Sequence, residues 1–337
     1  MNTKILLGHG SGGRMSHDLI QNMFMKYFDN PILKTQTDSA LLHLDNNTIA
    51  FTTDSYVVDP VFFPGGNIGD LAICGTVNDL AVSGAKPLYI SISFIIEEGF
   101  ELSQLETIVK SIANRAKEAN VLIVTGDTKV VNRGKCDKLF INTSGVGQID
   151  SKHFLISSGK NIQPNDMIII NGTIADHGMA IIGARENMSF STSIQSDSAP
   201  LNHLIRQVLS ETDHVHFMRD ITRGGLATVV TELVNNKMFG IEIYEEKIPY
   251  NEEVFGICEL LGFDPLHVAN EGKVLFVVKQ DDAEKILSVI KNNPYGKNAK
   301  IIGKIVDQHK GKAVLKTQIG ENRIIDMLAG EQLPRIC

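Results

Sequence analysis

The sequence predicts an α+β fold divided between two domains. The chain has 337 residues, which is more than a single hydrophobic core usually organises. Segments with the pattern of strands and hairpins are mixed with amphipathic helices, and this mixture is typical of α+β proteins rather than of a doubly wound parallel sheet. Ser157, Gly159 and Pro164 interrupt the periodicity of the chain, so we expect a domain boundary close to residue 150.

The first half contains the elements of one such domain. Residues 41–44 and 49–53 flank a polar turn, which predicts a β-hairpin. A glycine-rich segment leads into a helix around residues 16–27. The other elements expected here are helices over residues 70–84 and 102–119 and strands over residues 121–125 and 139–146.

The second half restarts with a strand and ends in a short polar segment. We expect strands over residues 167–170, 274–278 and 301–306 and helices over residues 176–185, 224–235 and 281–291. From Ala329 onward the composition predicts a mobile arm, and because an extended residue spans up to ~3.3–3.6 Å, this arm could reach well over 20 Å. We therefore divide the chain into residues 1–150, residues 151–310 and a C-terminal tail, residues 311–337.

Composition excludes several classes of function. The formal net charge of −7 argues against nucleic acid as the main partner, since binding phosphates requires clustered Lys and Arg. No segment has the length of a membrane span or the pattern of a signal peptide. The four cysteines (Cys74, Cys136, Cys258 and Cys337) form no Cys-x-x-Cys pair, which indicates a reducing, cytoplasmic location. We expect the three internal cysteines to be small core residues.

The chain ends in a cysteine, Cys337. A terminal cysteine is most often accidental, but this one follows Pro334, which stiffens its approach, and Arg335, whose charge favours a thiolate. A thiol at the end of a mobile arm is suited to carry a group from one site to another.

The segment Gly8–Gly13 formally matches the dinucleotide-binding pattern G-x-G-x-x-G, with Asp38 near the position of a ribose-binding acid. That fingerprint requires a βαβ unit, whereas a hairpin is expected after Asp38. We favour a loop that closes over phosphates or over the incoming tail, although a flexible entry to the following helix remains an alternative. A P-loop motif does not occur in the sequence.

Acidic residues at the ends of expected elements give a more specific signal. Taken singly, each is most often a cap or turn residue. Together, in a chain without Cys/His metal spacing, they suit a hard cation, and carboxylates that converge on nucleotide phosphates are a natural Mg²⁺ site. These residues are Asp38, Asp54, Asp79, Asp127 and Asp220.

Three further positions allow two interpretations each. Lys129 follows Asp127 closely and could contact a phosphate, but a solvated lysine after a strand is equally expected. Glu271 precedes a strand, where a turn acid is ordinary and a general base is the less common case. His214 and His216 have metal-ligand spacing without a third ligand nearby, so we interpret them as surface residues.

Taken together, these motifs resemble the HypE family of hydrogenase maturation proteins. These carbamoyl dehydratases belong to the superfamily of aminoimidazole ribonucleotide synthetase and selenophosphate synthetase. The resemblance extends over essentially the whole chain, and the Pro-Arg-Ile-Cys tail separates this family from its relatives. One departure is Ile221, where the family pattern has proline. The motifs are His9–Gly13, Phe63–Asp70, Cys74–Ala85, Gly126–Val130, Asp176–Gly178, Arg219–Asp220, Thr222–Gly225, Asn270–Gly272 and Pro334–Cys337.

The resemblance implies a fold, an activity and partners. The fold is the two-domain aminoimidazole ribonucleotide synthetase-like α+β fold, with mixed and antiparallel sheets, which dimerises and binds Mg-ATP through its first domain. A carbamoyltransferase partner loads a carboxamide onto Cys337, and the enzyme dehydrates it to a thiocyanate. The cyanide then passes to iron on a scaffold complex of two other maturation proteins, for the active site of [NiFe]-hydrogenase.

The resemblance also assigns roles to residues. It implies that Asp38, Asp54, Asp79 and Asp220 hold Mg-ATP. Asp127 and Lys129 are expected near the γ-phosphate, and Glu271 is the candidate base. The remaining candidates for cofactor binding are Asn78, Gly126, Thr128 and Arg223.

Two other functions remain open at this point. The chain could be a different ATP-dependent enzyme of the superfamily, such as a small-molecule kinase or ligase, in which case Cys337 would be dispensable. Alternatively, it could be a carrier whose tail only transports a group while ATP sets the position of the tail. A nicotinamide-dependent dehydrogenase is the least favoured possibility.

Overall fold

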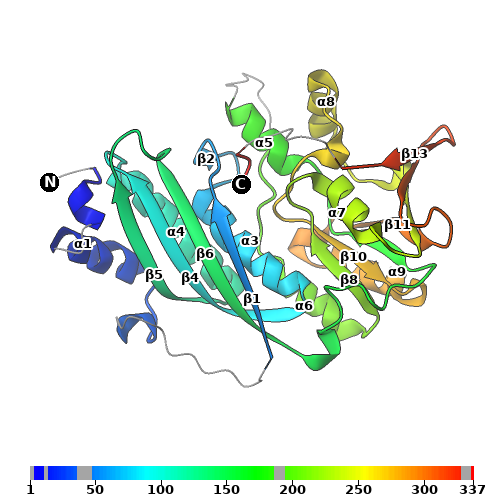
Figure 1. The fold of residues 1–337 in the computed structure, drawn as a ribbon, viewed down its shortest axis with the longest axis horizontal. Coiled ribbons are helices and arrows are strands. Elements are labelled where there is room, and N and C mark those ends of the chain that lie inside the picture. The colour runs from blue at the N-terminus through cyan, green and yellow to red at the C-terminus, as the bar shows by residue number, and fades with distance from the viewer. Residues whose placement is uncertain (1–3, 11–13, 36–47, 186–193, 328–334) are drawn as a thin grey trace.

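The protein consists of two α+β units that lie side by side, with the C-terminus between them (Figure 1). The computed structural model describes residues 4–10, 14–35, 48–185, 194–327 and 335–337. We call residues 4–150 the first unit and residues 151–327 the second. The described residues contain no helix long and apolar enough to cross a bilayer.

The first unit is built on a four-stranded sheet of order β1-β6-β4-β5, so that β1 and β5 form its two edges. β5 runs parallel to β4, and the other two pairings are antiparallel. The strands are β1 (Ile49–Tyr56), β4 (Ala85–Glu97), β5 (Leu122–Val131) and β6 (Leu139–Ile149), with a small separate pair β2 (Phe62–Phe63) and β3 (Gly66–Asn67). The helices are α1 (Arg14–Leu19), which continues through a π-helical turn (Ile20–Phe24) into α2 (Met25–Tyr27), and then α3 (Ile68–Val82) and α4 (Leu102–Ala119).

Helix α3 is the central element of the molecule. Its N-terminus is fixed by a capping box, in which the Asn67 side chain accepts from the Gly69 N–H and the Asp70 carboxylate accepts from the Asn67 N–H. Every residue of α3 except Asp79 is buried. A helix that is apolar on all sides must be covered on all sides, and α3 is covered by the sheet of its own unit, by α4 and by the second unit.

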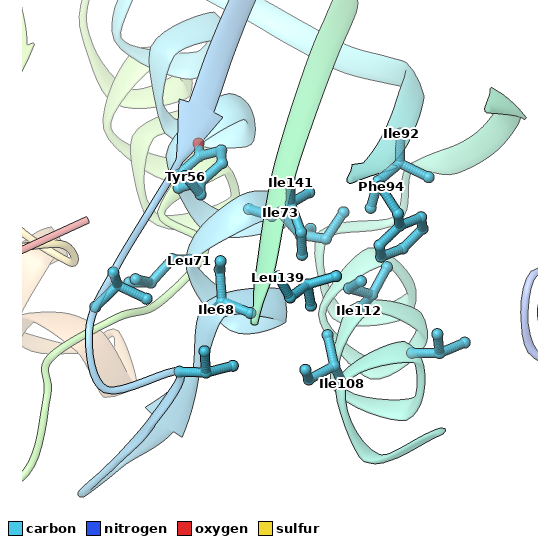
Figure 2. Close-up of a cluster of buried hydrophobic side chains, with 14 of the residues drawn as sticks. Tyr56, Ile68, Leu71, Ile73, Ile92, Phe94, Ile108, Ile112, Leu139 and Ile141 are labelled. Carbon is cyan, nitrogen blue, oxygen red and sulfur yellow. The ribbon is translucent and has the colours of Figure 1, made fainter. Parts of the chain in front are cut away.

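The core of the first unit forms where the strands meet α3 and α4. Figure 2 shows Ile92 and Phe94 of β4 and Leu139 and Ile141 of β6 pointing toward Ile68, Leu71 and Ile73 of α3 and toward Ile108 and Ile112 of α4. Tyr56 closes this cluster at the β1 edge, with its ring buried and its hydroxyl group directed to polar neighbours. The helices therefore cover one face of the sheet.

The second unit is built on a seven-stranded sheet of order β13-β12-β9-β11-β7-β10-β8. Helix α7 packs on one face, and α6 and α9 pack on the other together with the end of α3. The strands are β7 (Met167–Ile170), β8 (Val215–Asp220), β9 (Gly240–Tyr244), β10 (Val274–Val278), β11 (Lys300–Val306), β12 (Ala313–Lys316) and β13 (Asn322–Ile325). The helices are α5 (Asp176–Arg185), α6 (Asn202–Glu211), α7 (Gly225–Val234), α8 (Glu252–Leu261) and α9 (Ala283–Lys291).

Several expectations about individual elements need correction. The expected strand over residues 121–125 is longer, because Gly126 and Asp127 lie inside β5 and do not end it. In the expected hairpin, residues 41–44 lie outside the described residues. The expected second strand, residues 49–53, is part of β1, which pairs with β6. The second sheet continues to Ile325, beyond residue 310, after which we placed the start of the tail.

Gly75 of α3 lies close to the Tyr56 side chain of β1. A methyl group added there would collide with the Tyr56 hydroxyl. We expect Gly75→Ala to destabilise the protein by ~1–3 kcal/mol, as overpacking of a core does. In a Tyr56→Phe background the same change should cost less, because the colliding atom is gone. Urea unfolding of the two single variants and the double variant checks this, and additive effects would contradict it.

Candidate active site at the junction of the two units

Three of the expected acids converge where β1, α3 and β8 meet. Asp54 lies on β1, Asp79 near the end of α3 and Asp220 at the end of β8. The Thr52 hydroxyl donates to Asp79 (2.8 Å), and the Tyr56 hydroxyl donates to Asp54 (3.3 Å). Burial, followed by the charges of Asp220 and Asp54, raises the pKa of Asp79 to about 7. Burial also raises the pKa of Asp220 to about 6, with Asp54 adding to the effect.

Glu271 completes this acidic cluster from the second unit. Its side chain is buried, and its Oε1 atom has no hydrogen-bond partner among the described residues. Burial raises the pKa of Glu271 well above its usual value, and the charges of Asp197, Asp220 and Asp54 add to the effect. A buried carboxyl group with an unsatisfied oxygen is costly, which makes Glu271 a candidate functional residue.

The backbone of Glu271 is held from both units. Asn78 of α3 donates to the carbonyls of Glu271 (3.2 Å) and Ala199 (3.0 Å) and accepts from the Leu201 N–H (2.8 Å). Asp197 accepts from the Glu271 N–H (3.0 Å). Because the Asn78 amide is fully used by these backbone groups, it fixes the position of Glu271 relative to α3.

Asp197 forms a buried ion pair with Lys273 beside Glu271. The Lys273 Nζ lies 2.7 Å from the Asp197 Oδ2, and both side chains are less than a tenth exposed, at 9% and 6%. The charge of Lys273 lowers the pKa of Asp197 against the opposing effect of burial. The pair therefore anchors the turn that carries Glu271.

The last residues of the chain are docked at the same junction. The Cys337 carbonyl accepts from the Val57 N–H (3.1 Å), directly after β1. The Ile336 side chain is 2% exposed and packs in the core of the first unit, and Cys337 is half-buried against that core. The Ile336 carbonyl bonds to the Nε2 atom of His177 on α5 (2.8 Å). The C-terminus is thus held between the two units (Figure 1).

Asp127 and Lys129 lie elsewhere in the fold, contrary to the expectation that they converge with the other acids. They are on β5, at the opposite edge of the sheet from β1. The strand register also places them on the face opposite to Asp54, since Asp127 aligns with Ser93 and Asn142, which aligns with Ser55. The two side chains form an exposed ion pair (3.0 Å).

The β5 edge has a pocket of its own, of about 230 Å³. His9, from the glycine-rich segment, and Ser16 line one side, and residues 125–129 line the other. Gly126 and Thr128 belong to this second group. His9 and the Gly-Asp-Thr-Lys motif thus lie together, at the edge of the sheet opposite to Asp54.

The other expected residues fall as follows. Arg223 is exposed, and its charge lowers the pKa of Glu271 against the dominant effect of burial. Asp38 lies outside the described residues. His216 is largely buried and bonds to Asp166 (2.7 Å), so it is not the surface residue that we expected. Cys136 is half-exposed and is not a core residue.

Sequence reasoning missed four residues that shape the site: Tyr56, His177, Asp197 and Lys273. His177 lies in the Asp176–Gly178 motif and Lys273 follows the Asn270–Gly272 motif, but neither motif assigns these residues a role. The ion pair of Asp197 and Lys273 joins residues 76 positions apart, and no local pattern indicates such a pair. The described residues contain no group of three or more His, Cys, Asp or Glu side chains arranged to hold a metal ion unaided.

Comparison with known proteins identifies the family. Residues 36–149 match the AIR synthase related protein, N-terminal domain family, and residues 163–316 match the corresponding C-terminal domain family. The carbamoyl dehydratase HypE of Rhodobacter capsulatus is 45% identical over 99% of this chain and 98% of its own length. The chain belongs to the HypE family of carbamoyl dehydratases. The expected resemblance and the two-domain α+β fold are confirmed.

Solved HypE structures agree with this assignment. A crystal structure of the hydrogenase maturation protein HypE in complex with ATP matches with a TM-score of 0.94, at 45% identity over 98% of this chain and 99% of that chain. HypE in a crystal structure of a HypE–HypF complex matches with a TM-score of 0.80, at 49% identity over 92% of this chain and 99% of that chain.

The ion pair of Asp197 and Lys273 gives a test of how the Glu271 turn is held. We expect Lys273→Met to destabilise the protein by ~3–5 kcal/mol, because Asp197 is left buried and unpaired. The double variant Asp197→Asn/Lys273→Met should be less destabilised than Lys273→Met alone, since no charge remains to be buried. Urea unfolding measures all three proteins. A double variant that is the least stable of them would contradict this account.

Proposed function

We propose that this protein dehydrates a carboxamide carried on Cys337 to a thiocyanate, with ATP as the driving reagent. The observation that supports this most is the position of the terminal cysteine. It is docked at the junction that also holds Glu271 and the cluster of Asp54, Asp79 and Asp220. A substrate attachment point and a candidate base therefore border one site.

The reaction is chemically balanced with ATP as the acceptor of the oxygen atom. The S-carboxamide of Cys337 and ATP give the S-cyanate, ADP and phosphate, and the amide oxygen leaves in the phosphate. When bound, Mg-ATP supplies the γ-phosphoryl group that converts this oxygen from a poor leaving group into a good one. The protein must position the amide, accept the nitrogen protons and exclude water.

The acidic cluster fits Mg-ATP by its chemistry. Asp54, Asp79 and Asp220 offer only oxygen ligands, which Mg²⁺ prefers. Burial raises the pKa of Asp79 and of Asp220, and the charge of Asp54 adds to both effects. Mg²⁺ usually takes one or two carboxylates and completes its shell with water and phosphate oxygens, so a complete protein cage is not required. Arg223, exposed beside this cluster, is a candidate phosphate contact. We keep Asp38 as a further candidate ligand.

Glu271 is the proposed base. Its buried carboxyl group has an unpartnered oxygen and a raised pKa, so once deprotonated it binds a proton strongly. Asn78 and Asp197 hold its backbone, which keeps the carboxylate directed at one place. Both features suit a group that removes a proton from the amide nitrogen.

Asp127 and Lys129 would take part in nucleotide binding if a second copy of the chain packs on their face of the first sheet. The face of the first sheet that is not covered by any helix of the described residues carries exposed apolar side chains, which are 40–65% exposed: Ile49, Phe51, Ile95 and Leu122. Such a patch is typical of an interface. We propose that this face forms a homodimer, in which Asp127 and Lys129, on the same face, take part with Gly126 and Thr128 in nucleotide binding.

Two other partners follow from the proposed reaction. The carboxamide must come from a carbamoyl-transferring enzyme, and a HypE–HypF complex has been crystallised for a relative of this chain. The product must be passed on, and we propose an iron-holding scaffold complex of hydrogenase maturation as the acceptor. We also propose a cytoplasmic location, which the four free cysteines support.

Glu271→Gln tests the role of the base. The variant keeps the size of the side chain but cannot accept a proton, so we expect thiocyanate formation to fall by about 10²–10⁴-fold. ATP binding, measured by calorimetry, should remain. Glu284→Gln, an exposed change on α9, is the matched control. Undiminished thiocyanate formation by Glu271→Gln would assign the base to another group.

Asp79→Asn tests the acidic cluster as the metal site. Without divalent cations, removing one of the repelling charges should raise the unfolding temperature by about 1–2 °C, the shift that ~1 kcal/mol produces in a chain of this length. Adding MgCl₂ and ATP should then stabilise the variant less than the wild type. Thermal unfolding with and without both ligands measures this, with the exposed Asp281→Asn as a control. An unchanged response of Asp79→Asn to Mg-ATP would remove Asp79 from the site.

A further inference from the structure

The docked tail is held mainly through its backbone. The Val57 N–H donates to the Cys337 carbonyl (3.1 Å) and the Asp59 N–H donates to the Arg335 carbonyl (3.2 Å). This pairing continues the edge of the first sheet past the end of β1. The Arg335 side chain adds a bond from its Nε to the Val57 carbonyl (3.1 Å) and an ion pair with Asp137.

Helix α5 of the second unit contacts the same backbone from the other side. His177, at its start, bonds through Nε2 to the Ile336 carbonyl (2.8 Å). Arg185, at its end, donates through Nη2 to the Arg335 carbonyl (3.0 Å) and to the Asp59 carbonyl (2.7 Å). Long helical side chains lean toward the helix N-terminus, so Arg185 can reach a carbonyl next to the one that His177 holds.

The His177 ring is prepared for this contact. Since a carbonyl oxygen only accepts, Nε2 must carry the proton, and Nδ1 is left to accept from the Ser196 hydroxyl (2.8 Å). The ring is fully buried and makes an edge contact with Phe63, with the centroids 5.6 Å apart. A side chain fixed at both nitrogens and by its packing is a defined donor, not an adaptable one.

We infer that α5 is a two-point latch for the C-terminal tail, in which His177 and Arg185 are positioning residues that set where the thiol of Cys337 stands. The latch grips main-chain oxygens. Replacing the thiol hydrogen with a carboxamide or a nitrile therefore leaves every one of these bonds in place. The latch holds the free, loaded and product forms of the tail in the same way.

This insensitivity to cargo has a consequence for release. Residues 57–59 belong to the first unit and α5 to the second, so the full set of bonds exists only while both keep their positions around the tail. Release then depends on moving α5 or on a partner that competes for the tail, and not on the chemical state of Cys337. The statement about a carboxamide or a nitrile on Cys337 rests on the proposed function, whereas the existence of the latch does not.

Alkylation of Cys337 tests the latch directly. We would measure the rate of iodoacetamide labelling by mass spectrometry of the C-terminal peptide, in a Cys136→Ser background that removes the other partly exposed thiol. His177→Phe keeps the packing against Phe63 but removes the donor. We expect it to speed labelling by about 10-fold, the effect of losing one hydrogen bond of ~1.4 kcal/mol.

Further variants separate a latch from a general loss of structure. His177→Gln retains an N–H donor and should restore slow labelling in part, and Arg185→Met should speed labelling independently of the His177 site. His203→Phe, which removes a bond to the carbonyl of Glu118 on another element, should leave the rate unchanged. Labelling at the wild-type rate in both His177→Phe and Arg185→Met would overturn the latch.

The same variants separate the latch from the proposed function. With a pre-carbamoylated tail, His177→Phe should slow thiocyanate formation while ATP binding remains. Faster labelling of His177→Phe, together with a wild type that forms no thiocyanate at all, would support the latch and contradict the proposed function. The carboxamide form has no free thiol to label, so the exposure of its tail would be measured by the rate of limited proteolysis. If His177→Phe is labelled faster as the free thiol but is cleaved at the wild-type rate as the carboxamide, insensitivity to cargo is overturned.

Discussion

The structure depends on the burial of helix α3 between the two units. Fourteen of its fifteen residues are buried, so the helix has no stable exposed state and holds the two units against each other. The one residue that remains partly accessible is Asp79. The element that joins the units therefore also presents a carboxylate to the junction. Asn78, its neighbour, bonds to the backbone of the second unit and ties Glu271 to the same helix.

This arrangement explains why the chemistry is at the junction. Asp220 at the end of β8 and Glu271 in the turn before β10 are neighbours in the second sheet, and Asp54 on the edge strand β1 of the first sheet joins them beside α3. The tail docks just past the end of β1, where the N–H groups of Val57 and Asp59 donate to it. The chain segment that carries Asp54 therefore leads directly to the place where the tail binds.

The sequence predicted the parts of the site that have local signals. The cluster of Asp54, Asp79 and Asp220 and the importance of Glu271 and Cys337 follow from motifs, and their positions at one junction support that reasoning. Asp127 did not join them, because the strand before it continues through Gly126 and runs at the opposite edge of the sheet. Strand order is set by pairing between distant segments, and spacing along the chain does not record it.

The fold, like the site, was predicted where the sequence has local signals and missed where pairing between distant segments decides. Strong periodicity gave α4 correctly at both ends, and the short buried strands β7 and β10 were also correct. The long strand β4 and the helix α6 were missed. The formation of a strand inside a sheet and of a short helix depends on packing against distant segments, which the local pattern does not show. Lys273 and Asp197 were missed as a pair since their attraction acts across the fold.

In the proposed reaction Cys337 carries the substrate, and every other role assigned to the junction depends on this. The most direct measurement is mass spectrometry of the C-terminal peptide after incubation with the carbamoyl-loading partner and ATP. We predict a carboxamide adduct on Cys337 that then loses one water, and we predict that the loss requires ATP. An unmodified Cys337, or an adduct that loses water equally without ATP, would contradict the account.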